Sequence, residues 1–168
     1  MALAAITSVT FARPSNTTAY TAGDVIGAAD TGTPANAGSA IHTLTGVTQA
    51  DRFVMLLEAQ LLMFRSDVPS GMAGFRLHFY DAMPQAILDN AAFNLVAADR
   101  TRWRGSVDLP TPTDLGDTIA SQWTYCGLLL PVASGTTSLF VQLQALGAWT
   151  PASGTTHMIR ARFVEAGM

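Results

Sequence analysis

The sequence has no lysine and few charged residues of any kind. Charged side chains make up 12% of its 168 residues, against about 25% in ordinary globular proteins. All nine basic residues are arginines, the cation suited to bidentate pairs at interfaces, although a bias toward GC-rich codons accounts for the same choice. A chain this poor in charge has little with which to cover its own surface. We therefore expect part of that surface to be buried against another chain.

The sequence also lacks the features of several protein classes. The net charge of −3 and the isoelectric point near 5.4 argue against a nucleic-acid-binding surface. The first residues carry no basic segment and only a short apolar one, unlike a secretory signal. No apolar run approaches the length of a membrane span. We expect a chain that is made and folded in a cytoplasm, with no membrane stage of its own and no nucleic-acid partner.

No catalytic or metal-binding constellation is visible. The single cysteine, Cys126, permits no intrachain disulfide and lies in an apolar run, as a buried structural thiol does. The histidines are scattered without metal-ligand spacing (His42, His78 and His157). Three aspartates offer oxygen ligands for calcium but lack the alternation and closing glutamate of a calcium loop, so we expect turn-forming roles (Asp108, Asp114 and Asp117). We expect no enzyme, no metal and no cofactor.

The clearest strand signal is in residues 74–80, where Phe75, Leu77 and Phe79 alternate with more polar side chains. This pattern predicts a strand with one face in the core and one in solvent. The preceding run, residues 52–66, fits a helix face as well as a strand, and its composition suits helices. The β character of its surroundings favours a strand. The turn at residues 68–71 would then fold it back on residues 74–80 as an antiparallel hairpin.

Turn signals divide the rest of the chain into further short strands. Residues 28–40 read as an extended loop and residues 85–90 as one helical turn. Residues 133–137 and 152–156 both read Ala-Ser-Gly-Thr-Thr and each precedes a strand, which we interpret as two strands of one sheet. Eight to ten short strands at regular spacing predict an all-β fold. We expect one β-sandwich domain over residues 1–168, with a jelly roll as the preferred topology.

An arginine stripe is the first contact candidate. Arg100, Arg102 and Arg104 are spaced by two, so in a strand they share one face, with Thr101 and Trp103 on the other. Three cations on one face repel one another unless carboxylates lie opposite. Either the stripe pairs with a neighbouring subunit or an acidic surface, or it pairs within the chain with Asp99, Asp108 or Glu58.

The N-terminal segment is the second contact candidate. Residues 1–13 form either a first strand of the chain's own sheet or an arm that completes a neighbour's sheet by strand addition. The apolar side chains that such an arm would contribute are Leu3, Ile6 and Val9.

A carbohydrate-binding module is a third hypothesis, of another class, since aromatic rings stack on sugars. The rings available are those of Trp103, Trp123, Trp149 and Tyr80. Core positions are the commoner place for such side chains.

Three segments together resemble small structural proteins of tailed bacteriophages. They are residues 9–27 (VTFARPSNTTAYTAGDVIG), residues 74–80 (GFRLHFY) followed by residues 89–93 (DNAAF), and residues 147–154 (GAWTPASG) before a final strand. The resemblance implies a β-sandwich located in the virion and made in the host bacterial cytoplasm. It brings no catalytic residues with it.

The role implied by the resemblance is that of a capsid decoration, or cement, protein. Such a protein binds the major capsid protein and stabilises the shell through protein–protein contacts. Analogy with other cement proteins implies a homo-oligomer, specifically a homotrimer. A tail, baseplate or fibre-base component is the alternative that the same resemblance leaves open.

Overall fold

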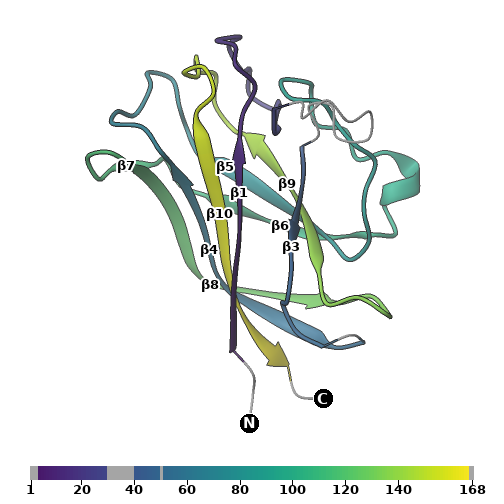
Figure 1. Cartoon of the computed structure of the whole chain (residues 1–168). Helices are drawn as coiled ribbons and strands as arrows, with labels where there is room; N and C mark the ends of the chain where they lie inside the picture. Colours follow the sequence, from purple (N-terminus) through teal and green to yellow (C-terminus); the bar gives the residue numbers. More distant parts are fainter. Residues whose placement is uncertain (1–3, 30–39, 50, 167–168) are drawn as a thin grey trace.

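The computed structural model describes residues 4–29, 40–49 and 51–166 (Figure 1). Within these ranges the regular structure is β, apart from one short 3₁₀ helix, η1 (Ala97–Asp99). No helix in the described ranges has the length and hydropathy needed to cross a membrane.

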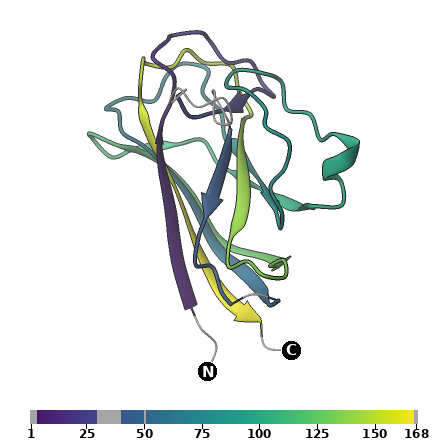
Figure 2. The ribbon, with the colours of Figure 1, turned by 45° about the vertical axis from the view of Figure 1, so that its right-hand side comes forward.

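The strands form two antiparallel sheets that face each other (Figures 1 and 2). The first, called here the β1 sheet, has the order β1 (Ala4–Ala12), β10 (Thr156–Ala166), β4 (Phe53–Met63), β8 (Ile119–Pro131) and β7 (Thr113–Asp114). The second, the β9 sheet, joins β9 (Leu139–Ala145) to β5 (Phe75–Tyr80) and β6 (Trp103–Leu109) on one side. On its other side β9 pairs with β2 (Val25–Ile26) and β3 (Ile41–Leu44).

This strand order is that of a jelly roll, as the sequence predicted. β2 and β3 pair with successive residues of the same β9 edge, so they occupy one strand position between them. If the two-residue β7 is also left out, the chain has eight strand positions. The first, eighth, third and sixth of these (β1, β10, β4 and β8) form the β1 sheet. The second, seventh, fourth and fifth form the β9 sheet. Two such interleaved four-strand sheets define the jelly-roll architecture.

Residues 53–63 form a strand and not a helix, and a bulge explains why their pattern was ambiguous. Val54 and Leu56 face the core, and so do Ala59, Leu61 and Met63. The pairing with β8 and β10 is irregular between Leu56 and Glu58, where Leu57 is the extra residue. Because a one-residue shift exchanges the two faces of a strand, the inward positions change from even to odd numbers at Leu57.

The predicted hairpin between residues 52–66 and 74–80 is wrong, because β4 and β5 lie in different sheets. The eleven residues 64–74 are too long for a tight hairpin and instead cross between the sheets. Met72, which is 6% exposed, enters the core on the way. A Cβ on Gly71 would lie 2.2 Å from the carbonyl oxygen of Ala148, so this crossing requires glycine there.

The two strands that follow the Ala-Ser-Gly-Thr-Thr repeats are also in different sheets, β9 in one and β10 in the other. The connection between them crosses from sheet to sheet and is held by Trp149. This tryptophan is 4% exposed and exchanges backbone hydrogen bonds with Tyr20, at 2.9 and 3.3 Å. Each repeat is therefore a crossover turn of the jelly roll and not half of a hairpin.

Residues 75–80 form a strand, as predicted, but the face expected in solvent is covered at His78 and Tyr80. His78 is 5% exposed and stacks on Phe93, with ring centroids 3.9 Å apart. Tyr80 is 1% exposed and donates a hydrogen bond to Gln142 at 2.8 Å. The long connection between β5 and β6 supplies this cover. It contains the only helical turn of the described chain at η1, and residues 85–90 do not form the predicted one.

A buried ion pair ties three loops together at one end of the sandwich. Arg13 is 0% exposed and lies 3.3 Å from the carboxylate of Asp89. The guanidinium also donates to the hydroxyl of Tyr20 at 3.0 Å and to the carbonyls of Asn16 and Ala152 at 2.6 and 3.3 Å. Asp89 in turn accepts a hydrogen bond from Tyr20 at 2.6 Å. Each charge is therefore compensated by hydrogen bonds as well as by its partner, as burial requires.

We predict that Arg13→Met destabilises the fold by about 3–5 kcal/mol, because it leaves the Asp89 carboxylate buried without its partner. Equilibrium unfolding in urea measures the change. Arg76→Met is the matched control, since the ion pair of Arg76 with Asp108 is exposed and such pairs contribute about 1 kcal/mol or less. Equal losses in the two variants would contradict this account of Arg13.

Candidate functional site

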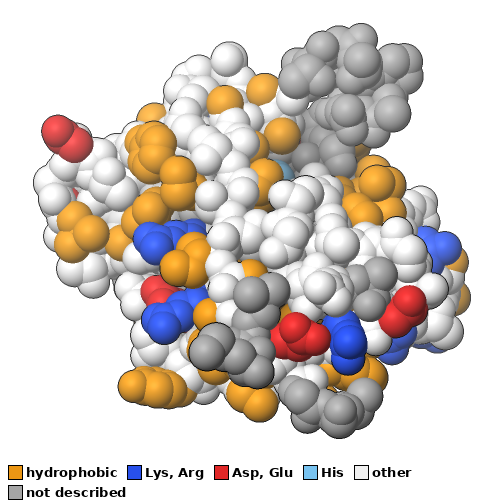
Figure 3. Space-filling model, turned by 60° about the horizontal axis from the view of Figure 1, so that its bottom comes forward, with side chains coloured by type: hydrophobic (Ala, Val, Ile, Leu, Met, Phe, Trp, Pro, Cys, Tyr) orange, Lys and Arg blue, Asp and Glu red, His pale blue; other side chains and the backbone are white. Residues whose placement is uncertain are grey.

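The outer face of the β1 sheet carries a row of apolar side chains across four strands. Ala4 pairs with Val164, Val164 with Met55, and Met55 with Leu129. Met55 is 37% and Leu129 48% exposed, whereas their neighbours Val54 and Leu130 are fully buried on the inner face. An outward row of this kind has no packing partner among the described residues. Figure 3 shows apolar side chains interspersed with charged ones on the lower part of this face.

The neighbouring row is mixed in character and surrounds a pocket. Ile6 pairs with Arg162, and Arg162 pairs with Glu58. Leu57, Glu58, Thr124, Tyr125 and Arg162 line a pocket of about 260 Å³. A smaller hollow beside it is lined by Ile6, Glu58, Arg160, Ala161 and Arg162. The apolar row and this mixed row, with Arg160, are called here the outer patch.

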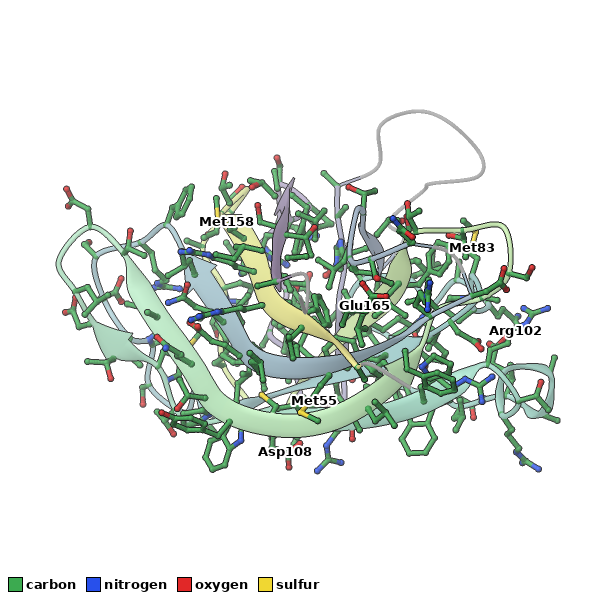
Figure 4. The ribbon with its side chains drawn as sticks, turned by 90° about the horizontal axis from the view of Figure 1, so that it is seen from below. Met55, Met83, Arg102, Asp108, Met158 and Glu165 are labelled. Carbon is green, nitrogen blue, oxygen red and sulfur yellow. The ribbon has the colours of Figure 1, made fainter. Side chains whose placement is uncertain are left out.

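Bulges at one level of two neighbouring strands, β4 and β8, create the pocket. Two successive paired positions run across β10, β4 and β8. Between them β10 has no extra residue, β4 has Leu57, and β8 has Tyr125, Cys126 and Gly127. Because each successive strand is longer than the one before, the sheet must bend at this level. Figure 4 shows the resulting curvature of β8 and β4, with Met55 and Met158 on the bent sheet.

Tyr125 is the most exposed of the large hydrophobic side chains among the described residues, at 92%. Its backbone has φ of 60°, a left-handed conformation that bulky residues adopt only at a cost of roughly 1–2 kcal/mol. The bulge therefore holds a tyrosine in an unfavourable conformation and directs it away from the core. Tyrosine and arginine are the residue types that most often dominate binding at interfaces.

The charges of the outer patch are not balanced within the described residues. Arg160 and Arg162 are exposed and form no ion pair there. Glu58 is the one carboxylate lining the same pocket and hollow. The patch thus has an excess of one positive charge on a chain whose net charge is −3.

The predicted arginine stripe does not lie on one strand face. β6 begins at Trp103, so Arg100 and Arg102 lie in the turn after η1 and only Arg104 is in the strand. Arg102 pairs with Asp99 at 3.4 Å, one of the intrachain partners expected, and donates to the carbonyl of Met83 at 2.9 Å. Arg104 pairs with Asp81, while Arg100 has no ion pair among the described residues. Figure 4 places Arg102 and Met83 together, away from Met158 of the outer patch's sheet.

The N-terminal candidates divide between the two faces of β1. This strand pairs with β10 of the same chain over nine residues, so in the described chain it is a strand of its own sheet. Ile6 points outward and is 61% exposed, whereas Val9 packs against the core. Leu3 lies outside the described residues. The structure thus brings Ile6 to the outer patch and leaves Val9 in a supporting position.

Two of the histidines enclose Phe11 in the core and do not form a metal site. The ring centroid of Phe11 is 3.8 Å from that of His42 and 5.3 Å from that of His157. Burial lowers the pKa of both histidines to about 4. A hydrogen bond to the backbone of Ile26 opposes the lowering of the His42 pKa, and one to the backbone of Thr155 opposes that of His157. The nearby charges of Arg13 and Arg65 lower the pKa of His157 further. Both Nε2 atoms are buried without a hydrogen-bond partner, so protonation would place two unsolvated charges in the core.

We predict that the fold loses stability as the pH falls from about 6.5 to about 4. A lowered folded-state pKa means that the unfolded chain binds protons first, so stability is present above the unfolded pKa and decreases below it. Each histidine accounts for roughly 3 kcal/mol over this range. Urea unfolding at a series of pH values measures the slope, and His42→Leu should reduce it by about half. An unchanged slope in this variant would assign the acid sensitivity to carboxylates instead.

Asp108 and Asp114 both accept hydrogen bonds within the chain. Asp108 pairs with Arg76 at 2.6 Å, and this hydrogen bond lowers the pKa of its carboxyl. Asp114 accepts a hydrogen bond from the backbone of Gly116 at 2.8 Å. In the described part of the chain no three potential metal ligands come together. Cys126 is half-buried in the β8 bulge, where burial raises the pKa of its thiol.

The four aromatic candidates for sugar stacking do not share a surface. Tyr80 and Trp149 are buried, at 1% and 4% exposure. Trp103 donates to Nδ1 of His78 at 3.3 Å, which makes Nε2 of His78 the donor to Gln144 at 3.1 Å. Only Trp123, at 49%, keeps a largely accessible ring.

Sequence reasoning missed the outer patch, although one signal was present. Arg160 and Arg162 alternate with the buried Ile159, Ala161 and Phe163 in the last strand, which marks two outward arginines. The rest of the patch comes from β4, β8 and β1, and its assembly depends on the strand order and the bulges. Neither the strand order nor the bulges can be predicted from a local pattern of residues.

No protein-family model matches the sequence, and a search of curated proteins finds no match. Among solved structures, the chain is similar to a chain of the cyanophage Pam1 capsid asymmetric unit, with 15% identity and a TM-score of 0.36, covering 99% of this chain and 86% of that one. It is similar to a chain of Cocksfoot mottle virus, with 8% identity, a TM-score of 0.32 and coverage of 99% and 96%. It is also similar to murine APRIL, with 15% identity and a TM-score of 0.31, covering 96% of this chain and 100% of that one. The jelly-roll assignment rests on the strand order and not on these scores.

Proposed function

We propose that this chain is a structural protein of a virus particle and acts by binding other proteins. The observation that carries the proposal is the outward apolar row formed by Ala4, Val164, Met55 and Leu129 on a jelly roll that is otherwise poor in charge. A free monomer gains nothing from such a row, whereas a subunit of an assembly buries it. The resemblance of three sequence segments to tailed-phage structural proteins supports the same role.

In its finer form, the proposal is a capsid decoration protein that binds the major capsid protein. Burial of the apolar row of the outer patch contributes roughly 25 cal/mol per Å² of apolar area before the costs of association. One such contact is weak, but many copies bound to a closed lattice reinforce the shell through avidity. A tail or baseplate component would use the same face in the same way, in fewer copies. The chain needs no reactive group for either role.

Copy number in purified particles separates these roles, and we predict a value set by the capsid lattice. Quantitative mass spectrometry against the major capsid protein gives the ratio. A simple ratio, such as one to one or one to three, supports decoration of the shell. A handful of copies per particle overturns the decoration role in favour of a tail component, and absence from particles overturns the virion role altogether.

We predict that Met55→Asp combined with Leu129→Asp weakens attachment to particles by at least about tenfold. The two side chains pair with each other at the centre of the apolar row, and a buried unpaired carboxylate at an interface costs more than the 1.4 kcal/mol that a factor of ten represents. Both positions are partly exposed, and two opposed carboxylates destabilise a strand pair by about 1 kcal/mol or less, so the free protein should stay folded, which circular dichroism checks. Co-sedimentation with particles that lack the protein measures attachment.

The arginines first identified from the sequence provide the matched comparison. Arg100→Ala, Arg102→Ala and Arg104→Ala together change the turn after η1 and the start of β6, and they leave the outer patch untouched. We expect this triple variant to attach normally. If instead it detaches while the Met55 and Leu129 variant binds, the contact lies on the η1 loop and the assignment to the outer patch is wrong.

A further inference from the structure

The turn between β7 and β8 presents an apolar side chain between two carboxylates. Leu115 is 64% exposed, and Asp114 and Asp117 beside it are exposed as well. Neither aspartate has an ion-pair partner among the described residues. Figures 1 and 2 both show this turn projecting from the body of the sandwich. The turn therefore offers an apolar side chain flanked by two carboxylates, a combination with a defined complement on another surface.

The turn is held in one shape. The backbone N–H of Leu115 donates to the carbonyl of Thr118 at 2.9 Å, and Asp114 accepts from the N–H of Gly116 at 2.8 Å. Gly116 has φ of 101°, a conformation that favours glycine. A turn ordered before binding loses little conformational entropy on docking.

The pocket of the outer patch matches this turn in size and in charge. Its volume is about 260 Å³, and cavities of about 150 Å³ accommodate a benzene ring, so a leucine side chain fits. Leu57 and Tyr125 supply an apolar lining, and Arg162 lies at the pocket with Arg160 in the adjoining hollow. Two unpaired arginines here correspond to two unpaired aspartates on the turn, and Glu58 offsets only one of the arginine charges.

A chain cannot fill its own pocket with its own turn. Leu115 lies in the turn before β8, and Thr124 is five residues beyond Ile119, the first residue of that strand, which separates the pocket from the turn by at least roughly 17 Å. The strand is fixed in the sheet by β4 over most of this length. The complementary surfaces can therefore meet only between two molecules.

We propose that the β7–β8 turn of one copy of this chain docks into the outer-patch pocket of a second copy. Leu115 enters the pocket between Leu57 and Tyr125, and Asp114 and Asp117 pair with Arg160 and Arg162 of the other molecule. The two surfaces are different, so the contact is head-to-tail and generates a ring where the rotation closes. This inference concerns the chain alone, and so goes beyond the proposed role in a particle.

Charge exchange on the purified full chain tests the contact. The first variant carries Asp114→Arg and Asp117→Arg, and the second carries Arg160→Asp and Arg162→Asp. Analytical ultracentrifugation follows self-association of each from about 1 µM to about 500 µM, the range of weak protein contacts. We expect the wild-type chain to associate, and each variant alone to associate at least about tenfold more weakly, because its turn and pocket then carry like charges.

An equimolar mixture of the two variants gives the decisive result. In the mixture, the turn of the first variant, which now carries arginines, can dock into the pocket of the second, which now carries aspartates. The unchanged turn of the second variant can dock into the unchanged pocket of the first. We therefore expect the mixture to regain association. Leu115→Ser should also weaken association, whereas Arg100→Asp, an exposed charge change away from the patch, should leave it unchanged. Circular dichroism confirms that each variant is folded.

Three results would overturn the inference: a wild-type chain that stays monomeric throughout the range, association that survives both charge exchanges, or a mixture that does not regain association. None of them depends on particles. A failure here therefore leaves the copy-number measurement, and with it the proposed function, to be judged separately.

Discussion

The buried pair of Arg13 and Asp89 is the constraint on which the rest of this jelly roll depends. Arg13 follows β1, Asp89 lies in the cover of the β9 sheet, and the carbonyl of Ala152 belongs to the crossover into β10. One guanidinium thus fixes the relative positions of segments separated by up to 139 residues in the sequence. A charge with no exposure is stable only in the arrangement that satisfies all its donors. This makes the pair a source of specificity as well as of stability.

The second constraint is the bend of the β1 sheet. Strands β10, β4 and β8 accommodate increasing numbers of residues at one level, so the sheet curves and the outward side chains on either side of the bend approach one another. The inner face keeps an uninterrupted core through Leu56, Ala59 and Phe163, each at 0% exposure. The same device therefore closes the sandwich and forms a concave site on its outside. Core packing and surface shape are not independent here.

The sequence allowed the fold class and most strands to be predicted, because alternation of apolar side chains is a local property. It identified the strand in residues 74–80 correctly, and it allowed both helix and strand for residues 52–66 because the bulge at Leu57 interrupts the alternation. Pairing partners were predicted wrongly, since crossovers and hairpins use the same turn residues. The arginine stripe failed for a related reason: spacing by two implies a shared face only inside a strand, and the turn after η1 places Arg100 and Arg102 before β6 begins. The outer patch draws on four strands, so only the assembled topology reveals it.

The unequal strand lengths at the bend have one more consequence. β8 already loops out Tyr125, Cys126 and Gly127 opposite a single residue of β4, and the ladders on both sides of the loop keep their own registers. Insertions or deletions at this point would be absorbed locally, without sliding either half of the strand. The shape of the outer patch can therefore be changed by inserting or deleting residues at this bulge, while the core on the inner face of the sheet stays the same.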